Sequence, residues 1–234
     1  MDKWLEDINK EAFTIFHHLN LFKQLGKIID ENENLRGKDQ TLFHWMRKAF
    51  TIDLVIGIGR LCDDGRDTQS LVRFLRTLKK KRSYLCRSRY VGLYKAKYND
   101  DKQMSKYMIE IGERDFDRLA GEKSDAYPVT QIDLDIKTLL KDGPCKKILD
   151  YRNEYIAHLS KVKKTKPPTY KDLYAAFEVI ERTIKKYVKL LNGAHLDSLT
   201  PMPQGDWQKV LTIPWLDITQ QKNDAIDKEV MKRS

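Results

Sequence analysis

One segment late in the chain, residues 151–158, holds the residue types that can cut RNA without a metal. It reads Tyr-Arg-Asn-Glu-Tyr-Ile-Ala-His and brings Arg152, Asn153 and His158 into one helical pattern. The planar guanidinium of an arginine binds a phosphate, and a histidine transfers protons near neutral pH. If these side chains act together, the chain is a metal-independent ribonuclease. If they do not, it is a basic helical binding protein.

Two groups of basic residues are candidates for binding an RNA backbone. The first follows the segment directly and consists of Lys161, Lys163 and Lys164. The second is the densest basic patch of the chain, in which Tyr84 and Tyr90 are interleaved as rings for base stacking. A solvated helix face without a ligand explains this second group equally well. Its members are Lys79, Lys80, Lys81, Arg82, Arg87 and Arg89.

Helical geometry separates Arg152 from His158. Six residues at about 100° each leave the two side chains roughly 120° apart around the axis and about 9 Å apart along it. Both can serve one phosphate only in a groove beside the helix, or if a second subunit supplies part of the site. A two-fold axis beside this helix brings two copies together, so a homodimer is the expected way to complete the site.

The composition points to an anionic partner. The chain of 234 residues has a net charge of +10 and a pI near 9.3, which favours nucleic acid first and a membrane surface second over a basic protein without such a partner. No apolar run approaches the roughly 20 residues of a membrane span, and the N-terminus lacks the charge and apolar core of a signal peptide. We therefore expect a cytoplasmic protein with no membrane partner.

No metal site and no other cofactor is expected. The three cysteines are odd in number and lie far apart without a CxxC pair, which argues against a disulfide framework and a structural zinc site. His17, His18 and His44 have no partner ligands at metal-binding spacing, so we interpret them as packed or surface histidines. Gly57 and Gly59 lie within an apolar helix and not after a strand, which indicates close helix packing and no dinucleotide fold.

The helices that must position these residues follow from apolar residues that recur at spacings of three to five. Asp67 or Thr68 is expected to cap the third helix, Pro144 to open the sixth, and Asn192-Gly193 to close the last. No segment is predicted to be a strand, so the expected fold is an all-α bundle. The predicted helices are 3–32, 41–62, 69–90, 102–119, 129–140, 144–166 and 169–191.

Two segments of this helical chain resemble those of a known superfamily. Arg152-Asn153-x4-His158 on a late helix resembles the motif of the HEPN superfamily (higher eukaryotes and prokaryotes nucleotide-binding). The segment 56–63, Ile-Gly-Ile-Gly-Arg-Leu-Cys-Asp, followed by Arg-Asp-Thr at 66–68, resembles the middle segment of its abortive-infection, AbiU-like branch. The resemblance covers residues 45–193.

The resemblance implies a helical bundle that pairs as a homodimer, many members being RNases in phage defence or toxin systems. It assigns the composite dimer cleft to Arg152, Asn153 and His158. His158 then acts as general base on the ribose 2′-OH or as acid toward the leaving oxygen, and Arg152 stabilises the pentacoordinate phosphate. Asn153 orients a phosphate oxygen or the histidine. The products are a 2′,3′-cyclic phosphate and a 5′-OH, and no metal is needed.

The resemblance also bears on partners. RNA is the expected ligand, and an antitoxin or defence protein is a further expected partner. HEPN toxins paired with a nucleotidyltransferase antitoxin often carry a Tyr two residues after the His, where this chain has Ser160, which argues against that form of regulation. The alternative is a non-catalytic helical module that keeps the fold and binds RNA or a protein.

A change in composition after the last predicted helix divides the chain in two. Residues 1–193 are expected to form the all-helical, HEPN-like antiparallel bundle with an extra N-terminal helix. Residues 194–234 contain prolines at intervals and two tryptophans, Trp207 and Trp215. We expect this extension to pack across the bundle as an irregular strap.

Overall fold

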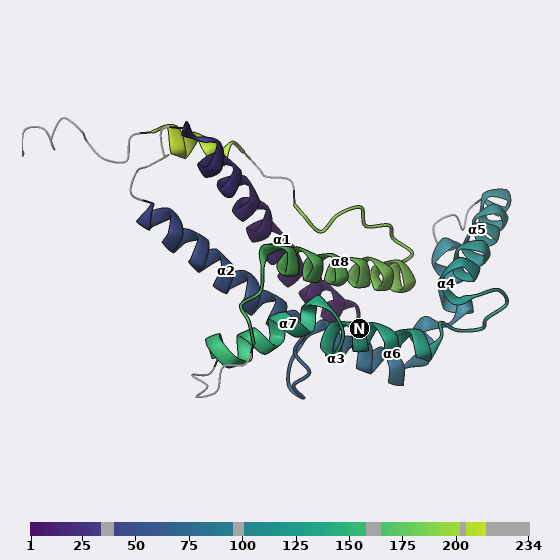
Figure 1. The fold of residues 1–234 in the computed structure, drawn as a ribbon. Helices are drawn as coiled ribbons and strands as arrows, with labels where there is room; N and C mark the ends of the chain where they lie inside the picture. The colour runs from purple at the N-terminus through teal and green to yellow at the C-terminus, as the bar shows by residue number, and fades with distance from the viewer. Residues whose placement is uncertain (34–39, 96–100, 158–164, 202–204, 214–234) are drawn as a thin grey trace, which may run out of the picture. The chain divides into compact units, whose positions relative to one another are not determined.

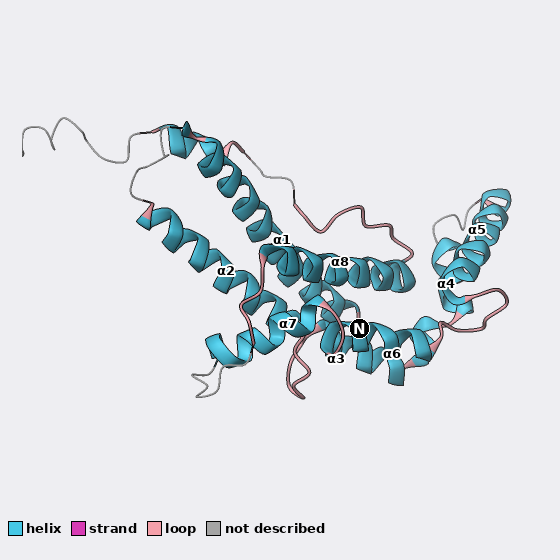
Figure 2. Cartoon of the chain, viewed as in Figure 1, coloured by secondary structure: helices cyan, strands magenta, loops and turns pink. Residues whose placement is uncertain are grey.

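The structure, a computed structural model, describes residues 1–33, 40–95, 101–157, 165–201 and 205–213. In these ranges the chain is helical, and its only sheet-like pairing is an isolated antiparallel bridge between Cys86 and Ala126 (Figures 1 and 2). The all-α prediction is confirmed. The helices are α1 (Asp2–Glu31), α2 (Thr41–Leu61), α3 (Leu71–Lys80), η2 (Arg82–Leu85), α4 (Arg87–Lys95), α5 (Lys102–Ala120), α6 (Val129–Leu140), α7 (Pro144–Tyr151), η4 (Arg152–Ala157), α8 (Tyr170–Asn192) and η5 (Trp207–Thr212).

Helices α1 and α2 pack against each other, but α2 has two different halves. Every buried residue of α2 lies between Leu54 and Leu61, whereas residues 41–53 are exposed or half-buried. Gly57 permits the close approach of α1, because a Cβ built there would lie 2.7 Å from Cδ1 of Ile15. This confirms close helix packing as the role of Gly57.

Helix α8 contacts α1, α2, α4, α6 and α7 and supplies the longest apolar stripe of the core, including the buried Phe177 and Ile184. Thr169 and Asp172 form a capping box at its first turn. Lys147 of α7 donates to Asp172 over 2.6 Å, and this contact, with the hydrogen bonds from Thr169, lowers the pKa of Asp172 to about 2. Helix α7 is thereby tied to the start of α8.

The predicted helix 69–90 is wrong in its second half, where the structure has α3, η2 and α4. Near Leu85 and Arg87 the backbone forms hydrogen bonds with the loop before α6. Tyr127 N–H donates to the Leu85 carbonyl at 2.9 Å, and Arg87 N–H donates to the Asp125 carbonyl at 2.8 Å. A continuous helix would need these groups for its own bonds. The cap of α3 is Ser70, whose hydroxyl accepts from Arg73 N–H, and not Asp67 or Thr68.

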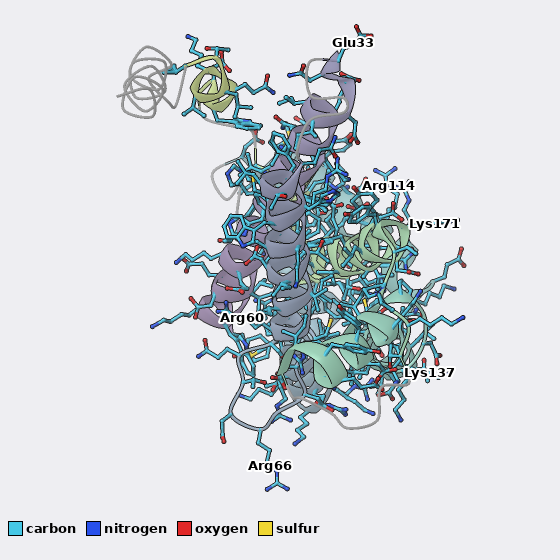
Figure 3. The ribbon with its side chains drawn as sticks, turned by 60° about the vertical axis from the view of Figure 1, so that its left-hand side comes forward. Glu33, Arg60, Arg66, Arg114, Lys137 and Lys171 are labelled. Atoms are coloured by element: carbon cyan, nitrogen blue, oxygen red, sulfur yellow. The ribbon has the colours of Figure 1, made fainter. Side chains whose placement is uncertain are left out.

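Charged side chains cover the surface: Arg114, Lys137 and Lys171 project from helices, and Arg66 projects from the loop between α2 and α3 (Figure 3). None of the helices in the described ranges combines the length and apolar content that a bilayer crossing requires.

The end of the chain divides into two parts. Residues 194–201 belong to the same compact unit as the bundle, since Leu199 is buried and its N–H donates to Oε1 of Glu181 at 3.0 Å. Residues 202–234 form a second unit, of which the structure describes 205–213 with the short helix η5. The packing of the extension on the bundle stays a prediction, and Trp215 lies outside the described residues.

Candidate active site

The segment that follows α7 departs from α-helical geometry. Residues Arg152–Ala157 form a π-helical turn, η4, directly after Tyr151. Such single π turns are rare and often occur at functional sites. Glu154 links this turn to the segment that leads into α8, because its Oε2 accepts a hydrogen bond from Thr165 N–H at 2.8 Å. The sequence predicted an unbroken helix here, since apolar spacing does not distinguish a π turn from an α turn.

Asn153 holds the guanidinium of Arg152. Nε and Nη2 of Arg152 donate to the amide Oδ1 of Asn153 at 3.1 and 2.9 Å. An arginine has five N–H donors, so three remain outside these two hydrogen bonds. An amide oxygen carries no charge, and Arg152 keeps its positive charge while its orientation is fixed. The family resemblance implied that Asn153 orients a phosphate oxygen or the histidine, whereas in the structure it orients Arg152.

Arg152 lies directly over Gly59 of α2. A Cβ built on Gly59 would be 2.5 Å from Nη1 and 3.1 Å from Cζ of Arg152, which is closer than carbon and nitrogen atoms pack. Only a glycine leaves room for the guanidinium in this position. The two segments that carried the family resemblance, 56–63 and 151–158, therefore meet at one contact. The signal in the sequence was the second glycine, Gly59, which was attributed to close helix packing together with Gly57 and not to a contact with Arg152.

Two buried cysteine thiols lie close to each other, and one of them, Cys62, is near enough to Arg152 to be affected by its charge. Cys62 and Cys145 are buried and free of disulfides. A hydrogen bond with Cys145 and burial raise the pKa of the Cys62 thiol, although the nearby charge of Arg152 acts in the opposite direction. Cys62 is therefore a protonated packing residue and not a nucleophile.

Several predicted site residues lie outside the described residues. They are His158, Lys161, Lys163 and Lys164. Their approach to Arg152 stays a prediction. The described part of the predicted catalytic set is thus Arg152 and Asn153, and these two are in direct contact.

The predicted RNA-binding residues on α3 and α4 divide into two kinds. Lys79 forms an ion pair with Asp133 of α6 at 2.6 Å. Arg89 donates to the Leu191 carbonyl at 2.9 Å. By contrast, Lys80, Lys81 and Arg82 are exposed. Binding of RNA by this α3–α4 basic patch (Lys79, Lys80, Lys81, Arg82, Arg87 and Arg89) stays a prediction.

Arg87 of the same patch is held from three sides. Its guanidinium donates to Glu113 at 2.6 Å, to Asp117 at 2.5 Å and to the Ser124 carbonyl at 2.8 Å. These contacts join α4 to α5 and fix the loop after α5. The ring prediction for Tyr90 is wrong, because this side chain is buried in the core, where it cannot stack on a base.

The α3–α4 basic patch and Arg152 belong to different packing arrangements. Helix α3 packs on α6 and α1, whereas η4 packs on α2 and α7. The contacts of the described residues therefore bring Arg152 together with Gly59 and Asn153, and they do not bring it to the patch.

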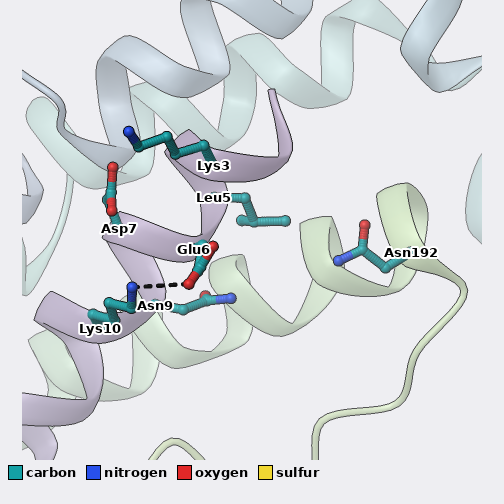
Figure 4. Close-up of a pocket in the computed structure, with 7 residues that line it drawn as sticks. All are labelled: Lys3, Leu5, Glu6, Asp7, Asn9, Lys10 and Asn192. Carbon is teal, nitrogen blue, oxygen red and sulfur yellow. Dashed lines mark ion pairs between the residues drawn. The ribbon is translucent and has the colours of Figure 1, made fainter.

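Two hollows of the bundle surface differ in chemistry. One, of about 610 Å³, lies between the first turns of α1 and Asn192 at the end of α8 (Figure 4). Its lining mixes both signs of charge, and Lys10 pairs with Glu6 at 2.8 Å. The other, of about 540 Å³, lies between α2 and η4, beside Arg152 in the chain. This second hollow was not predicted from the sequence. One of its residues, His44, was interpreted there as a packed or surface histidine.

Comparison with known proteins gives one positive result. The family model described as HEPN_AbiU2: AbiU2 matches residues 1–210 of this chain. The search of curated proteins and that of solved structures give no match.

Proposed function

The chain belongs to the AbiU2 family of HEPN proteins, and we propose that it is a metal-independent endoribonuclease acting in antiviral defence or as a toxin. One observation carries the proposal: Arg152 lies over Gly59, is oriented by the neutral amide of Asn153, and retains its charge. An arginine fixed in this way is suited to binding a phosphate, because its donors are oriented before the anion arrives.

The proposed reaction is an in-line transfer at phosphorus. His158 takes the proton of a ribose 2′-OH, and the 2′-oxygen attacks the adjacent phosphorus. The bond from phosphorus to the 5′-oxygen breaks, and that oxygen receives a proton from a second acid, for which His158 of a partner subunit is the natural candidate. Arg152 stabilises the charge that develops on the phosphate oxygens. The products are a 2′,3′-cyclic phosphate and a 5′-OH.

The active form is proposed to be a homodimer. In regular helical geometry six residues leave Arg152 and His158 about 120° apart around the axis, so one copy alone presents them in different directions. Two copies related by a two-fold axis beside η4 bring the pair of motifs into one cleft. RNA is the proposed substrate, with the exposed Lys80, Lys81 and Arg82 and the lysines after His158 as backbone contacts. An antitoxin or defence protein is the proposed regulator.

A second candidate function is binding of RNA without cleavage. The exposed cations of η2 and the end of α3 favour it, because Lys80, Lys81 and Arg82 offer charge to a polyanion at a distance from Arg152. In this case the loss of His158 leaves function intact, and neutralising these three residues removes RNA binding.

Cleavage of labelled RNA in excess EDTA tests the proposal. Wild type is compared with Arg152→Ala, His158→Ala and the control Arg114→Ala, whose side chain projects from α5 (Figure 3). We expect wild type and the control to release ends with a cyclic phosphate, and the two site variants to lose at least about a hundredfold in rate. Mixing the two inactive variants should restore part of the activity if the cleft is composite.

Two results would contradict the proposal. Equal cleavage by all four proteins assigns the activity to another site. RNA binding by folded wild type without cleavage of any RNA class favours the binding module.

A further inference from the structure

The hollow between α2 and η4 combines aromatic rings with cationic side chains. Two of its rings, Tyr151 and Tyr155, are stacked with their centroids 4.8 Å apart and their planes at 22°. A third ring, Tyr170 at the start of α8, is 45% exposed and packs against Phe22. The hollow is lined by His44, Arg47, Lys48, Thr51, Ile52, Tyr151, Tyr155, Ile156 and Tyr170.

The cationic side chains of the hollow, Arg47 and Lys48, come from the exposed half of α2, which also supplies His44. His44 and Lys48 stand one turn apart on the helix face that continues through Ile52, and both are exposed. Arg47 lies beside them and pairs with Asp30 at 2.5 Å, so part of its charge is neutralised. Among the described residues that line the hollow none carries a carboxylate. The hollow therefore has a net positive lining.

This combination matches the chemistry of a nucleotide in a single strand. Aromatic rings bind bases by stacking, irrespective of base type, and cations bind the phosphate. Ile52 and Ile156 supply an apolar wall, and a volume of about 540 Å³ falls in the usual range for small-ligand pockets. Neither a base nor a phosphate alone would use both parts of the lining.

The hollow lies near Arg152, as the positions of its lining residues along η4 and along α2 both indicate. Tyr151 and Arg152 are consecutive, and Gly59, over which Arg152 lies, follows Ile52 on α2 by seven residues, about 10 Å of helix. We propose that this hollow is a nucleotide-binding subsite, in which one base of a single-stranded RNA stacks on the tyrosines while Lys48 and His44 hold its phosphate. The subsite rests on the proposed function, because it would position the strand for cleavage beside Arg152.

The test measures binding apart from cleavage. The full-length His158→Ala protein is titrated with a labelled oligouridylate and with an abasic oligomer of the same length. Into this background we introduce Tyr155→Ala, Tyr155→Phe and Lys48→Ala, with Lys102→Ala as the matched control, since Lys102 is an exposed lysine at the start of α5.

Tyr155→Ala should weaken binding of the oligouridylate about tenfold, as expected for one lost stacking contact, and leave the abasic oligomer unaffected. Tyr155→Phe should retain wild-type affinity because it retains the ring. Lys48→Ala should weaken both probes and lower the salt dependence by about one ion. Lys102→Ala should change neither probe.

Two outcomes overturn the subsite. One is unchanged binding of the oligouridylate by Tyr155→Ala, and the other is an equal loss for both probes, which would indicate general damage to the fold. The proposed function fails separately: if the expected pattern of binding appears but wild type cleaves no RNA, the subsite stands and the ribonuclease does not. If wild type cleaves RNA and the variants bind unchanged, the ribonuclease stands and the subsite does not.

Discussion

Two arginines of this protein, Arg152 and Arg87, are both partly buried and both held by oxygen acceptors, yet their surroundings differ in charge. Arg87 donates to the carboxylates of Glu113 and Asp117 and is 18% exposed. Among the residues that the structure describes, Arg152 donates to a neutral amide, that of Asn153. The first arrangement cancels the guanidinium charge inside the fold, and the second preserves it.

This difference separates an arginine that stabilises the fold from one that can bind an anion. A guanidinium that forms an ion pair with a carboxylate attracts a phosphate only weakly, because the phosphate must then compete with that internal ion pair. An amide oxygen fixes the orientation and leaves the charge available. The contrast assigns Arg87 to the junction of α4 and α5, and it assigns Arg152 to the candidate active site.

The same contrast applies to whole basic regions. In the α3–α4 basic patch Lys79 pairs with Asp133, and beside the patch Arg76 pairs with Asp64, so part of the charge in this region is neutralised by ion pairs. The smaller cluster on α2 includes Lys48 and His44, which line a hollow with tyrosines.

The largest effect on stability is expected from Arg87→Ala. It leaves Glu113 and Asp117 without their shared cation, and the loss of these charged hydrogen bonds, at carboxylates that are partly exposed, should lower the free energy of unfolding by about 2 kcal/mol. Chemical denaturation measures this change. The control is Arg118→Ala, whose side chain is 79% exposed and should change stability very little. A loss of stability equal to that of the control would show that the carboxylates do not depend on Arg87.

An intermediate effect, on activity and not on stability, is expected from Gly59→Ala. The new Cβ would overlap Arg152, and since a long side chain can move, the guanidinium should shift away from its site. We expect cleavage to fall by about tenfold or more, whereas stability is retained or rises, because alanine favours a helix by about 1 kcal/mol over glycine. Cleavage kinetics and thermal unfolding measure the two effects.

Gly57→Ala is the matched control, two residues away on the same helix. Its Cβ would meet the packed side chain of Ile15, so the expected loss is of stability, with activity per folded molecule retained. If both glycine variants behave alike, Gly59 serves only helix packing and has no specific relation to Arg152.

The smallest effect concerns Asp172, which ties α7 to α8 through Lys147. Folding lowers its pKa to about 2, so its ionisation stabilises the folded state above the pKa of the unfolded chain, about 4, and this gain is lost as pH falls through about 2. Asp172→Asn should cost about 1 kcal/mol near neutral pH. The difference from wild type should shrink between pH 4 and pH 2 in denaturation measured as a function of pH. A difference that does not change with pH would rule out the carboxylate charge as its cause.

The bounds of a helix were predicted well from the sequence where a single apolar stripe ran along the whole helix. The bounds of α1, α2, α5, α6 and α8 lie within a few residues of the predicted ones, because the apolar spacing marks the extent of each helix. The predicted helix 69–90 failed, because its break depends on hydrogen bonds between residues 85–87 and 125–127. A local sequence pattern does not indicate hydrogen bonds between segments that are so far apart in the chain.

The candidate site was predictable in its residues but not in its contacts. The motif identified Arg152 and Asn153 as a pair, and the second glycine of segment 56–63 indicated a close approach. Which group approaches Gly59, and that Asn153 holds Arg152, depend on the packing of η4 against α2. The hollow with Lys48 was not predicted, because its walls come from elements that are far apart in the chain, α2 and the segment around η4.

The most direct test of this account compares Arg152→Ala with Arg87→Ala in one cleavage assay, with rates expressed per folded molecule and unfolding midpoints measured in parallel. We predict that Arg152→Ala loses at least about a hundredfold in rate with its midpoint unchanged, and that Arg87→Ala loses stability with its rate retained. The account is contradicted if Arg152→Ala lowers the midpoint and retains the rate, because Arg152 would then be a structural residue like Arg87.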